Sequence, residues 1–128
     1  MLAVTGLYAG LLALLFLALS VAVIHGRRAA NVGLGDGGNS MLARRIRGHG
    51  NFAEYVPMVL MLMAIAELNQ VPEWRIHVVG AALLAGRLLH GYCFVCTESH
   101  PPTRAGGMVL TFAALLIGSL NCLWSVLA

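Results

Sequence analysis

Four residues that could bind a polar ligand are spaced along one short stretch, "RIRGHGNFAEYVP", at positions 45–57. They are Arg47, Asn51, Glu54 and Tyr55. An α-helix turns by about 100° per residue, so these side chains share an arc about 100° wide if the helix reaches back to Arg47. The stretch therefore predicts one helix face that carries a guanidinium, a carboxamide, a carboxylate and a phenol.

A second polar stripe occurs in "GRLLHGY", where Arg87 and His90 are separated by two leucines. The two side chains differ in direction by about 60° on a helix, and Phe94 lies within about 20° of Arg87. Ionisable groups inside apolar segments usually face protein or a water-filled cavity, because exposure to hydrocarbon is costly. Arg87 and His90 are therefore expected to point into the molecule.

Further arginines stand at the ends of apolar segments: Arg27 and Arg28 follow the first, and Arg104 precedes the last. Together with Arg47 and Arg87 they outnumber the carboxylate of Glu54. A surplus of forked guanidinium donors suits an anionic ligand that carries carboxylates. Glu54 and Asn51 could then hold an amine or peptide groups of the same ligand.

A purely structural role explains part of this pattern equally well. Glu54 and Arg87 could form an ion pair that joins two helices, with Asn51 as an interhelical hydrogen bonder. The excess of arginine over carboxylate is the feature that this alternative leaves unexplained.

The elements that must position these residues are four apolar segments, at about 2–24, 51–68, 75–94 and 106–127. Each is close to the ~20 residues that cross a bilayer as a helix, and helices satisfy every backbone amide within the segment. Hydrophobic residues make up 59% of the chain and charged residues only 10%, against about 25% charged in soluble domains. The sequence predicts an all-α membrane protein, a single domain of four transmembrane helices over residues 1–128.

The arginines also predict the orientation in the membrane. The first loop and its flanks contain Arg27, Arg28, Arg44, Arg45 and Arg47, and the third contains Arg104, whereas the second has only Arg75. Positive charge marks the cytoplasmic side, so both termini are expected outside the cytoplasm. No basic region precedes the first segment, which argues against a cleaved signal peptide. No basic face with interleaved aromatics suggests nucleic-acid binding.

Two other motifs match the patterns of known sites but lack the neighbouring elements that those sites need. Gly33, Gly35 and Gly38 match G-x-G-x-x-G, but no strand precedes them, so a glycine-rich turn is the better interpretation. Cys93 and Cys96 form C-x-x-C without a second ligand pair, and they point away from Arg87. We interpret them as packing residues and expect no metal.

The polar stripes resemble the signature of the MAPEG family, the membrane-associated proteins of eicosanoid and glutathione metabolism. Arg47, Asn51, Glu54, Tyr55 and Pro57 fill the family's second-helix pattern, and Pro57 is expected in the first turns of that helix. "GRLLHGY" is similar to the family's Arg-x-x-His segment, "RAGGM" to the start of its fourth helix, and "LGDGGN" to loops of bacterial members.

The resemblance implies a homotrimer of four-helix protomers in a bacterial inner membrane, with glutathione bound near the cytoplasmic face between subunits. It implies that glutathione is bound by Arg27 or Arg28, and by Arg47, Asn51, Glu54, Tyr55, Arg87 and His90. Arg104 resembles the arginine proposed in related synthases to stabilise the glutathione thiolate. One departure is Phe94, which stands where the eicosanoid synthases have a tyrosine, and it argues against a specific eicosanoid activity.

The predicted function is a glutathione-dependent membrane transferase that attacks lipophilic electrophiles, with peroxidase activity as a related reaction of the same thiolate. One alternative is a family member that binds glutathione or lipid without catalysis. Another is a small four-helix drug/proton exporter, but those proteins depend on a carboxylate deep in the first helix, and that segment has no charge here.

Overall fold

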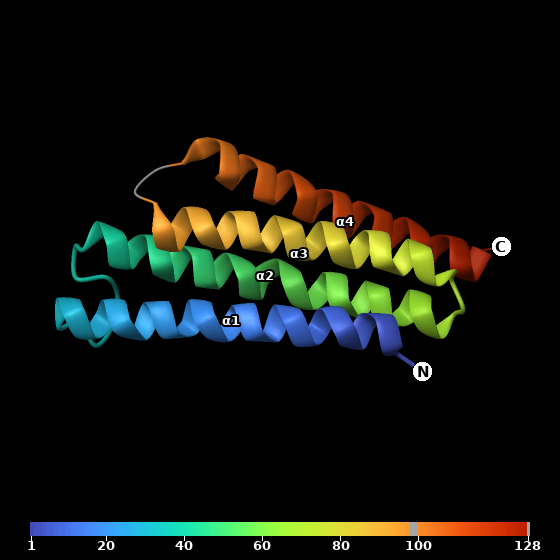
Figure 1. The fold of residues 1–128 in the computed structure, drawn as a ribbon, viewed down its shortest axis with the longest axis horizontal. Helices are drawn as coiled ribbons and strands as arrows, with labels where there is room; N and C mark the ends of the chain where they lie inside the picture. Colours follow the sequence, from blue (N-terminus) through green and yellow to red (C-terminus); the bar gives the residue numbers. More distant parts are fainter. Residues whose placement is uncertain (98–99, 128) are drawn as a thin grey trace.

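The computed structural model describes residues 1–97 and 100–127, and these residues form four helices and no strand. All four helices are long and apolar enough to cross a membrane, as predicted. They run up and down beside one another (Figure 1). Both termini lie at one end of the bundle together with the turn between α2 and α3. Arg47, Arg87 and Arg104 are therefore placed towards the opposite end.

Helix α1 spans Ala3–Ala30 and continues past the predicted boundary at residue 24. Hydropathy marks only the segment that suits hydrocarbon, whereas the polar turn containing Arg27 and Arg28 continues the same helix. Asn31 ends it in the left-handed conformation, with φ of 54°, as is common for a residue after the last turn. At the other end, the carboxylate of Glu67 accepts hydrogen bonds from the backbone N–H groups of Val4 and Thr5, at 2.9 and 2.7 Å.

Helix α2 spans Ser40–Leu68 and begins eleven residues before the predicted segment. The Asn39 side chain caps it by accepting a hydrogen bond from the N–H of Leu42 at 2.9 Å. The helix therefore reaches back beyond Arg47, which was the condition for the common polar face. The long N-terminal extension also changes the place of Pro57, which lies in the helix interior rather than in its first turns. Because proline has no N–H, one helical hydrogen bond is missing there.

Helix α3 spans Glu73–Cys96 and α4 spans Pro101–Leu127. The fourth helix starts before the predicted position 106, because Pro101 and Pro102 occupy its first turn, where a fixed φ favours the helix and a missing N–H costs little. Arg104 consequently belongs to the first turns of α4 and not to a loop. In the first loop, Gly35, Gly37 and Gly38 adopt positive φ, which agrees with the predicted glycine-rich turn.

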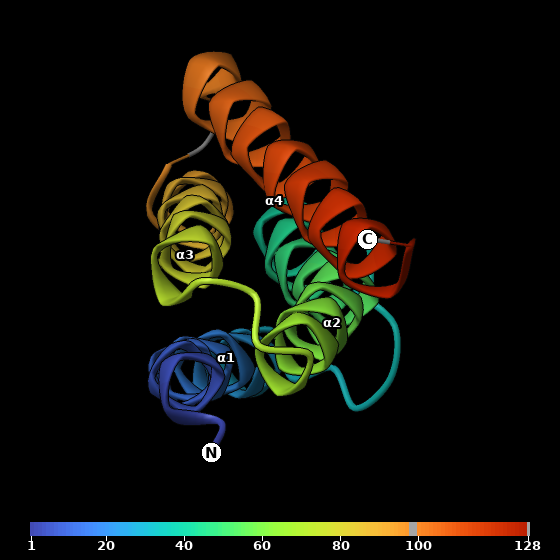
Figure 2. The same ribbon diagram turned by 90° about the vertical axis from the view of Figure 1, so that its right-hand side faces the viewer.

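The two middle helices, α2 and α3, each pack against the other three, whereas α1 and α4 do not contact each other over the described residues. The end-on view shows α1 and α4 on opposite sides of the bundle (Figure 2). Side chains such as Leu12, Val59, Ile76 and Leu83 fill the interior and are almost fully buried. Many leucines point outward from α1 and α4, as expected for helices whose outer surface faces lipid.

Candidate functional site

The centre of the polar region is Arg87 on α3, whose side chain is only 1% exposed. Its Nη1 donates to Oδ1 of Asn51 on α2, and its Nη2 donates to Oγ1 of Thr111 on α4, both at 2.7 Å. One guanidinium thus connects three helices. Because these bonds lie in a buried environment, they fix the guanidinium in one position.

Small residues allow this three-helix contact. A Cβ added to Gly86 would lie 2.8 Å from the carbonyl oxygen of Gly107, so the backbones of α3 and α4 approach too closely for a larger side chain. The Thr111 hydroxyl donates to the same Gly107 carbonyl at 2.8 Å. Its lone pairs therefore remain available for Arg87. The sequence analysis missed Thr111, although its hydroxyl lies seven positions after Arg104 and therefore on the same side of the helix.

Arg47 and Glu54 form an ion pair of their own on α2, with Nη1 of Arg47 3.0 Å from Oε1 of Glu54. Their side chains are 62% and 50% exposed, whereas Asn51 is buried. The polar arc of α2 therefore has an inner part and an outer part. Among the described residues Glu54 does not pair with Arg87, which contradicts the purely structural alternative of a Glu54–Arg87 bridge.

Tyr55 and His90 extend the polar region in two directions. The ring of Tyr55 meets Phe112 of α4 edge to face, with centroids 5.6 Å apart. His90 is 4% exposed and lies against Phe94, with ring centroids 4.7 Å apart. A Cβ on Gly107 would lie 2.9 Å from the backbone nitrogen of His90. Helix α4 therefore passes directly over His90 and keeps it in the interior.

Phe94 links His90 to Arg104. The guanidinium carbon of Arg104 lies 5.8 Å from the centre of the Phe94 ring, and that of Arg44 lies 5.5 Å from it. Both distances are within the range of cation–π attraction. The departure from the tyrosine of the eicosanoid synthases thus places an aromatic ring without a hydroxyl near two guanidiniums. Arg104 itself is exposed.

The arginines of the first half of α2 have different roles. Arg44 donates to the carbonyl oxygens of Cys93 and Thr97, at 2.9 and 3.0 Å, and so satisfies carbonyls at the C-terminal end of α3. Arg45 donates to the Ala22 carbonyl of α1 at 3.3 Å. Both tie neighbouring helices to α2. Over the part of the chain that the structure describes, Arg47 makes neither type of contact, and its exposed guanidinium pairs with Glu54, a partner that a ligand could replace.

Arg27 and Arg28 stand apart from the other predicted site residues. They lie in the last turn of α1, and Arg27 donates to the carbonyl oxygen of Gly35 in the first loop at 2.7 Å. Within residues 1–97 and 100–127, neither makes a hydrogen bond or ion pair with the α2, α3 and α4 site residues. The protomer thus brings together the polar residues of α2, α3 and α4 and leaves those of α1 aside.

A cavity of about 220 Å³ lies beside Arg104. Its walls come from α2, from the end of α3 and from the start of α4, and they consist of Arg44, Cys93, His100, Pro101, Arg104, Ala105 and Met108. The two guanidiniums make this cavity cationic. It could admit part of an anionic ligand from the same end of the bundle on which Arg47 and Glu54 are exposed.

Comparison with known proteins decides the family. The model of the MAPEG family matches residues 5–124, nearly the whole chain. The chain belongs to the MAPEG family. The residues of the three-helix polar region and the exposed Arg47–Glu54 pair all fall within the matched MAPEG segment.

The inner membrane protein YecN of Escherichia coli K12 is 43% identical over 121 residues, which cover 94% of this chain and 91% of that protein. YecN of Escherichia coli O6:H1, strain CFT073, matches equally well. No solved structure matches the chain significantly. Four membrane-spanning helices and an inner-membrane relative identify this MAPEG protein as a multi-pass protein of the inner membrane.

Proposed function

We propose that this MAPEG protein is a glutathione-dependent transferase that joins the glutathione thiol to lipophilic electrophiles. The observation that carries the proposal is the polar face of α2: Asn51 is fixed by the buried Arg87, and the Arg47–Glu54 pair stands exposed beside it. The family to which the chain belongs supplies the tripeptide as the candidate ligand.

Glutathione has two carboxylates and one ammonium group, and the polar face offers complementary charges. The guanidinium of Arg47 suits a carboxylate, and the carboxylate of Glu54 suits the ammonium. Asn51 can bond a peptide group while Arg87 holds its oxygen. On binding, glutathione would replace the Arg47–Glu54 pair by two ligand pairs, so the exposed ion pair serves as a preformed site with both charges in place.

The exposure of this ion pair supports a homotrimer as part of the proposal. Both side chains lie on a helix that is long and apolar enough to cross a membrane, and charged side chains on such helices usually face protein or a water-filled cavity. A neighbouring copy would cover them. It would also supply Arg27 or Arg28 from its α1, the helix that the protomer itself keeps away from α4.

Arg104 is proposed as the catalytic residue. A guanidinium beside the glutathione sulfur favours the thiolate, which is the nucleophilic form, and the thiol proton passes to water. The thiolate electron pair then forms a bond to an electrophilic carbon of a substrate that arrives from the lipid, and the leaving group departs with its bonding electrons. Holding the thiolate close to a substrate dissolved in the bilayer supplies the remaining rate enhancement.

The test uses the protein purified in detergent, with glutathione titrated by calorimetry, thiolate absorbance recorded in the ultraviolet, and conjugation to 1-chloro-2,4-dinitrobenzene followed over time. Wild type should bind glutathione at or below millimolar concentration and form the conjugate. Arg47→Ala should weaken binding at least ten-fold, and Arg104→Ala should remove thiolate absorbance and turnover while binding persists.

Glu73→Gln serves as a control, because Glu73 is an exposed charge at the other end of the bundle. It should leave binding and turnover as in wild type. A wild-type protein that does not bind glutathione at millimolar concentration would refute the proposal.

Phe94 favours a second candidate, a member that binds glutathione without catalysis, because its ring offers no hydroxyl to a thiol beside His90 and Arg104. In that case glutathione would bind to wild type and to Arg104→Ala with equal affinity, and neither would form a conjugate. Introducing the hydroxyl with Phe94→Tyr would then be the natural attempt to restore turnover.

A further inference from the structure

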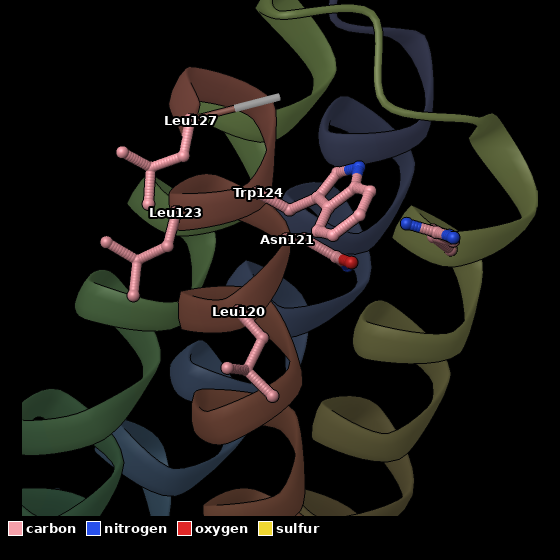
Figure 3. A pocket seen from close by; sticks show the side chains of 6 residues that line it. Leu120, Asn121, Leu123, Trp124 and Leu127 are labelled. Atoms are coloured by element: carbon pink, nitrogen blue, oxygen red, sulfur yellow. The ribbon is translucent and has the colours of Figure 1, made fainter.

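A second hollow lies near the end of the bundle that carries both termini, far along α3 and α4 from the glutathione residues. Its volume is about 690 Å³. Its walls are Arg75 at the start of α3 and a group of residues at the end of α4, Leu120, Asn121, Leu123, Trp124 and Leu127. Figure 3 shows the α4 side chains around it. The wall is therefore mainly apolar, with one cation, one amide and one indole.

Asn121 is the unexpected residue in this wall. It is 7% exposed, and its amide nitrogen has no hydrogen-bond partner among the described residues. A buried donor without a partner is costly. Asn121 also lines the hollow, where it adds one amide to an otherwise apolar group of α4 side chains. Asn121 thus provides a polar group that a molecule in the hollow could satisfy.

A smaller hollow of about 270 Å³ adjoins the first and shares Arg75 and Trp124 with it. The other walls of the smaller hollow come from the α2–α3 turn and the end of α4, and they include polar side chains: Asn69, Gln70, Val71, Pro72 and Ser125. The amide of Asn69 donates to the Ser125 hydroxyl at 3.0 Å, which joins the two sides. An apolar chamber and a chamber with more polar walls therefore meet at a guanidinium and an indole.

Arg75 supplies the only basic side chain of either chamber. Its guanidinium carbon lies 5.4 Å from the Trp74 ring, and within residues 1–97 and 100–127 no carboxylate lies within 4.0 Å of it. The nearby acid Glu67 uses both oxygens on the N-terminus of α1. Guanidinium groups match phosphate oxygens in shape and charge, and tryptophan is typical of the depth where lipid headgroups lie.

We propose that these two chambers bind one anionic phospholipid of the leaflet nearest the two termini. Its phosphate lies against Arg75, its polar headgroup occupies the chamber of Asn69, Gln70 and Ser125, and an acyl chain runs along Leu120 and Leu123. Arginine and tryptophan at a membrane interface need no ligand by themselves. The apolar chamber, the adjoining chamber with more polar walls and the buried Asn121 amide are what distinguish a lipid site from a simple interfacial anchor.

The test uses the chain's two tryptophans. In a Trp74→Phe background, the fluorescence of Trp124 is measured in nanodiscs of phosphatidylcholine into which phosphatidylglycerol with brominated acyl chains is mixed in steps. Brominated phosphatidylcholine is used for a parallel series. Half-maximal quenching should need about five-fold less brominated phosphatidylglycerol, the preference expected from one arginine near the membrane surface.

Arg75→Gln should abolish this preference, and the control Glu73→Gln should preserve it. Asn121→Ala should raise the amount of either brominated lipid needed for half-maximal quenching. If Arg75→Gln fails to fold, the comparison of the two lipids on the wild-type protein decides. Equal quenching by both lipids in wild type, or a preference that persists in the folded Arg75→Gln protein, would overturn the proposal. Protection of Trp124 from both brominated lipids would also overturn it, because another copy of the chain would then cover the hollow. None of these outcomes depends on glutathione binding.

Discussion

The two ends of the bundle use polar residues in different ways. At the end of Arg87, hydrogen bonds from one buried guanidinium join α2, α3 and α4. At the opposite end, the carboxylate of Glu67 on α2 accepts hydrogen bonds from the first amides of α1. The Tyr8 hydroxyl lies 3.2 Å from Nδ1 of His77 on α3. The first arrangement concentrates charge where a ligand could use it. The second holds α1 to its neighbours and leaves a hollow beside α4.

The polar residues at the two ends therefore have different roles: those around Arg87 could bind a ligand, and those around Glu67 join helices. Glu67 and Tyr8 at this end are occupied by other groups of the chain itself, so their loss should change stability alone. Polar groups at the Arg87 end have an exposed continuation in Arg47 and Glu54, so their loss should change both stability and glutathione binding. Three substitutions test this distinction.

The largest effect is expected from Arg87→Met. The substitution leaves the Asn51 carboxamide and the Thr111 hydroxyl without their shared donor in a buried environment, at about 1–3 kcal/mol for each unsatisfied group. Thermal unfolding in detergent should show a clear loss of stability, and calorimetry should show no glutathione binding. Normal glutathione binding by Arg87→Met would mean that the three-helix contact only joins helices, as the contact of Glu67 with α1 does at the opposite end.

Gly107→Ala should have a smaller effect of about 1–3 kcal/mol, as expected for overpacking. The new Cβ would lie 2.7 Å from the Gly86 carbonyl oxygen and 2.9 Å from the His90 backbone, so α4 must move away from α3 and Thr111 from Arg87. Gly106→Ala is a matched control one position earlier, where nothing lies within 4 Å of the added Cβ. Equal unfolding temperatures for the two variants would contradict the close crossing of α3 and α4.

Glu67→Ala should have the smallest of the three effects, about 1 kcal/mol, typical of a lost helix cap with its favourable charge at the helix N-terminus. Hydrogen exchange should increase at the first amides of α1, whereas glutathione binding should stay unchanged. Glu73→Ala is the control, since Glu73 is exposed in the first turn of α3. A change in glutathione affinity with Glu67→Ala would show that the two ends are coupled.

The sequence was sufficient to predict the four helices, because long apolar segments have few other stable forms in a membrane. It also predicted that Arg47 and Asn51 share one side of α2, since helical phase depends only on spacing. Phase does not determine the partner across the interface, and so the pairing of Arg87 with Asn51 and Thr111, rather than with Glu54, could not be foreseen. It depends on the Gly86–Gly107 contact, which is set by how α3 and α4 cross.

The predicted helices were shorter than the observed helices for a related reason. Hydropathy falls at Arg27 and through the stretch before Asn51, but backbone hydrogen bonding continues there, as the Asn39 cap and the first-turn prolines of α4 show. The displaced boundary matters most for Pro57, which an early start of α2 moves into the helix interior. Charged residues outside the apolar core can still be helical when caps and neighbouring helices satisfy their backbone.

The carboxylate that caps α1 also constrains the order in which the chain is assembled. The amides of Val4 and Thr5 donate to the carboxylate of a residue 62 to 63 positions further along, at the far end of the next helix. As the polypeptide leaves the ribosome, α1 enters the membrane with these amides still open, and only a completed second crossing brings Glu67 to them. The α1–α2 hairpin is therefore the smallest unit of the chain in which the N-terminus of α1 is capped.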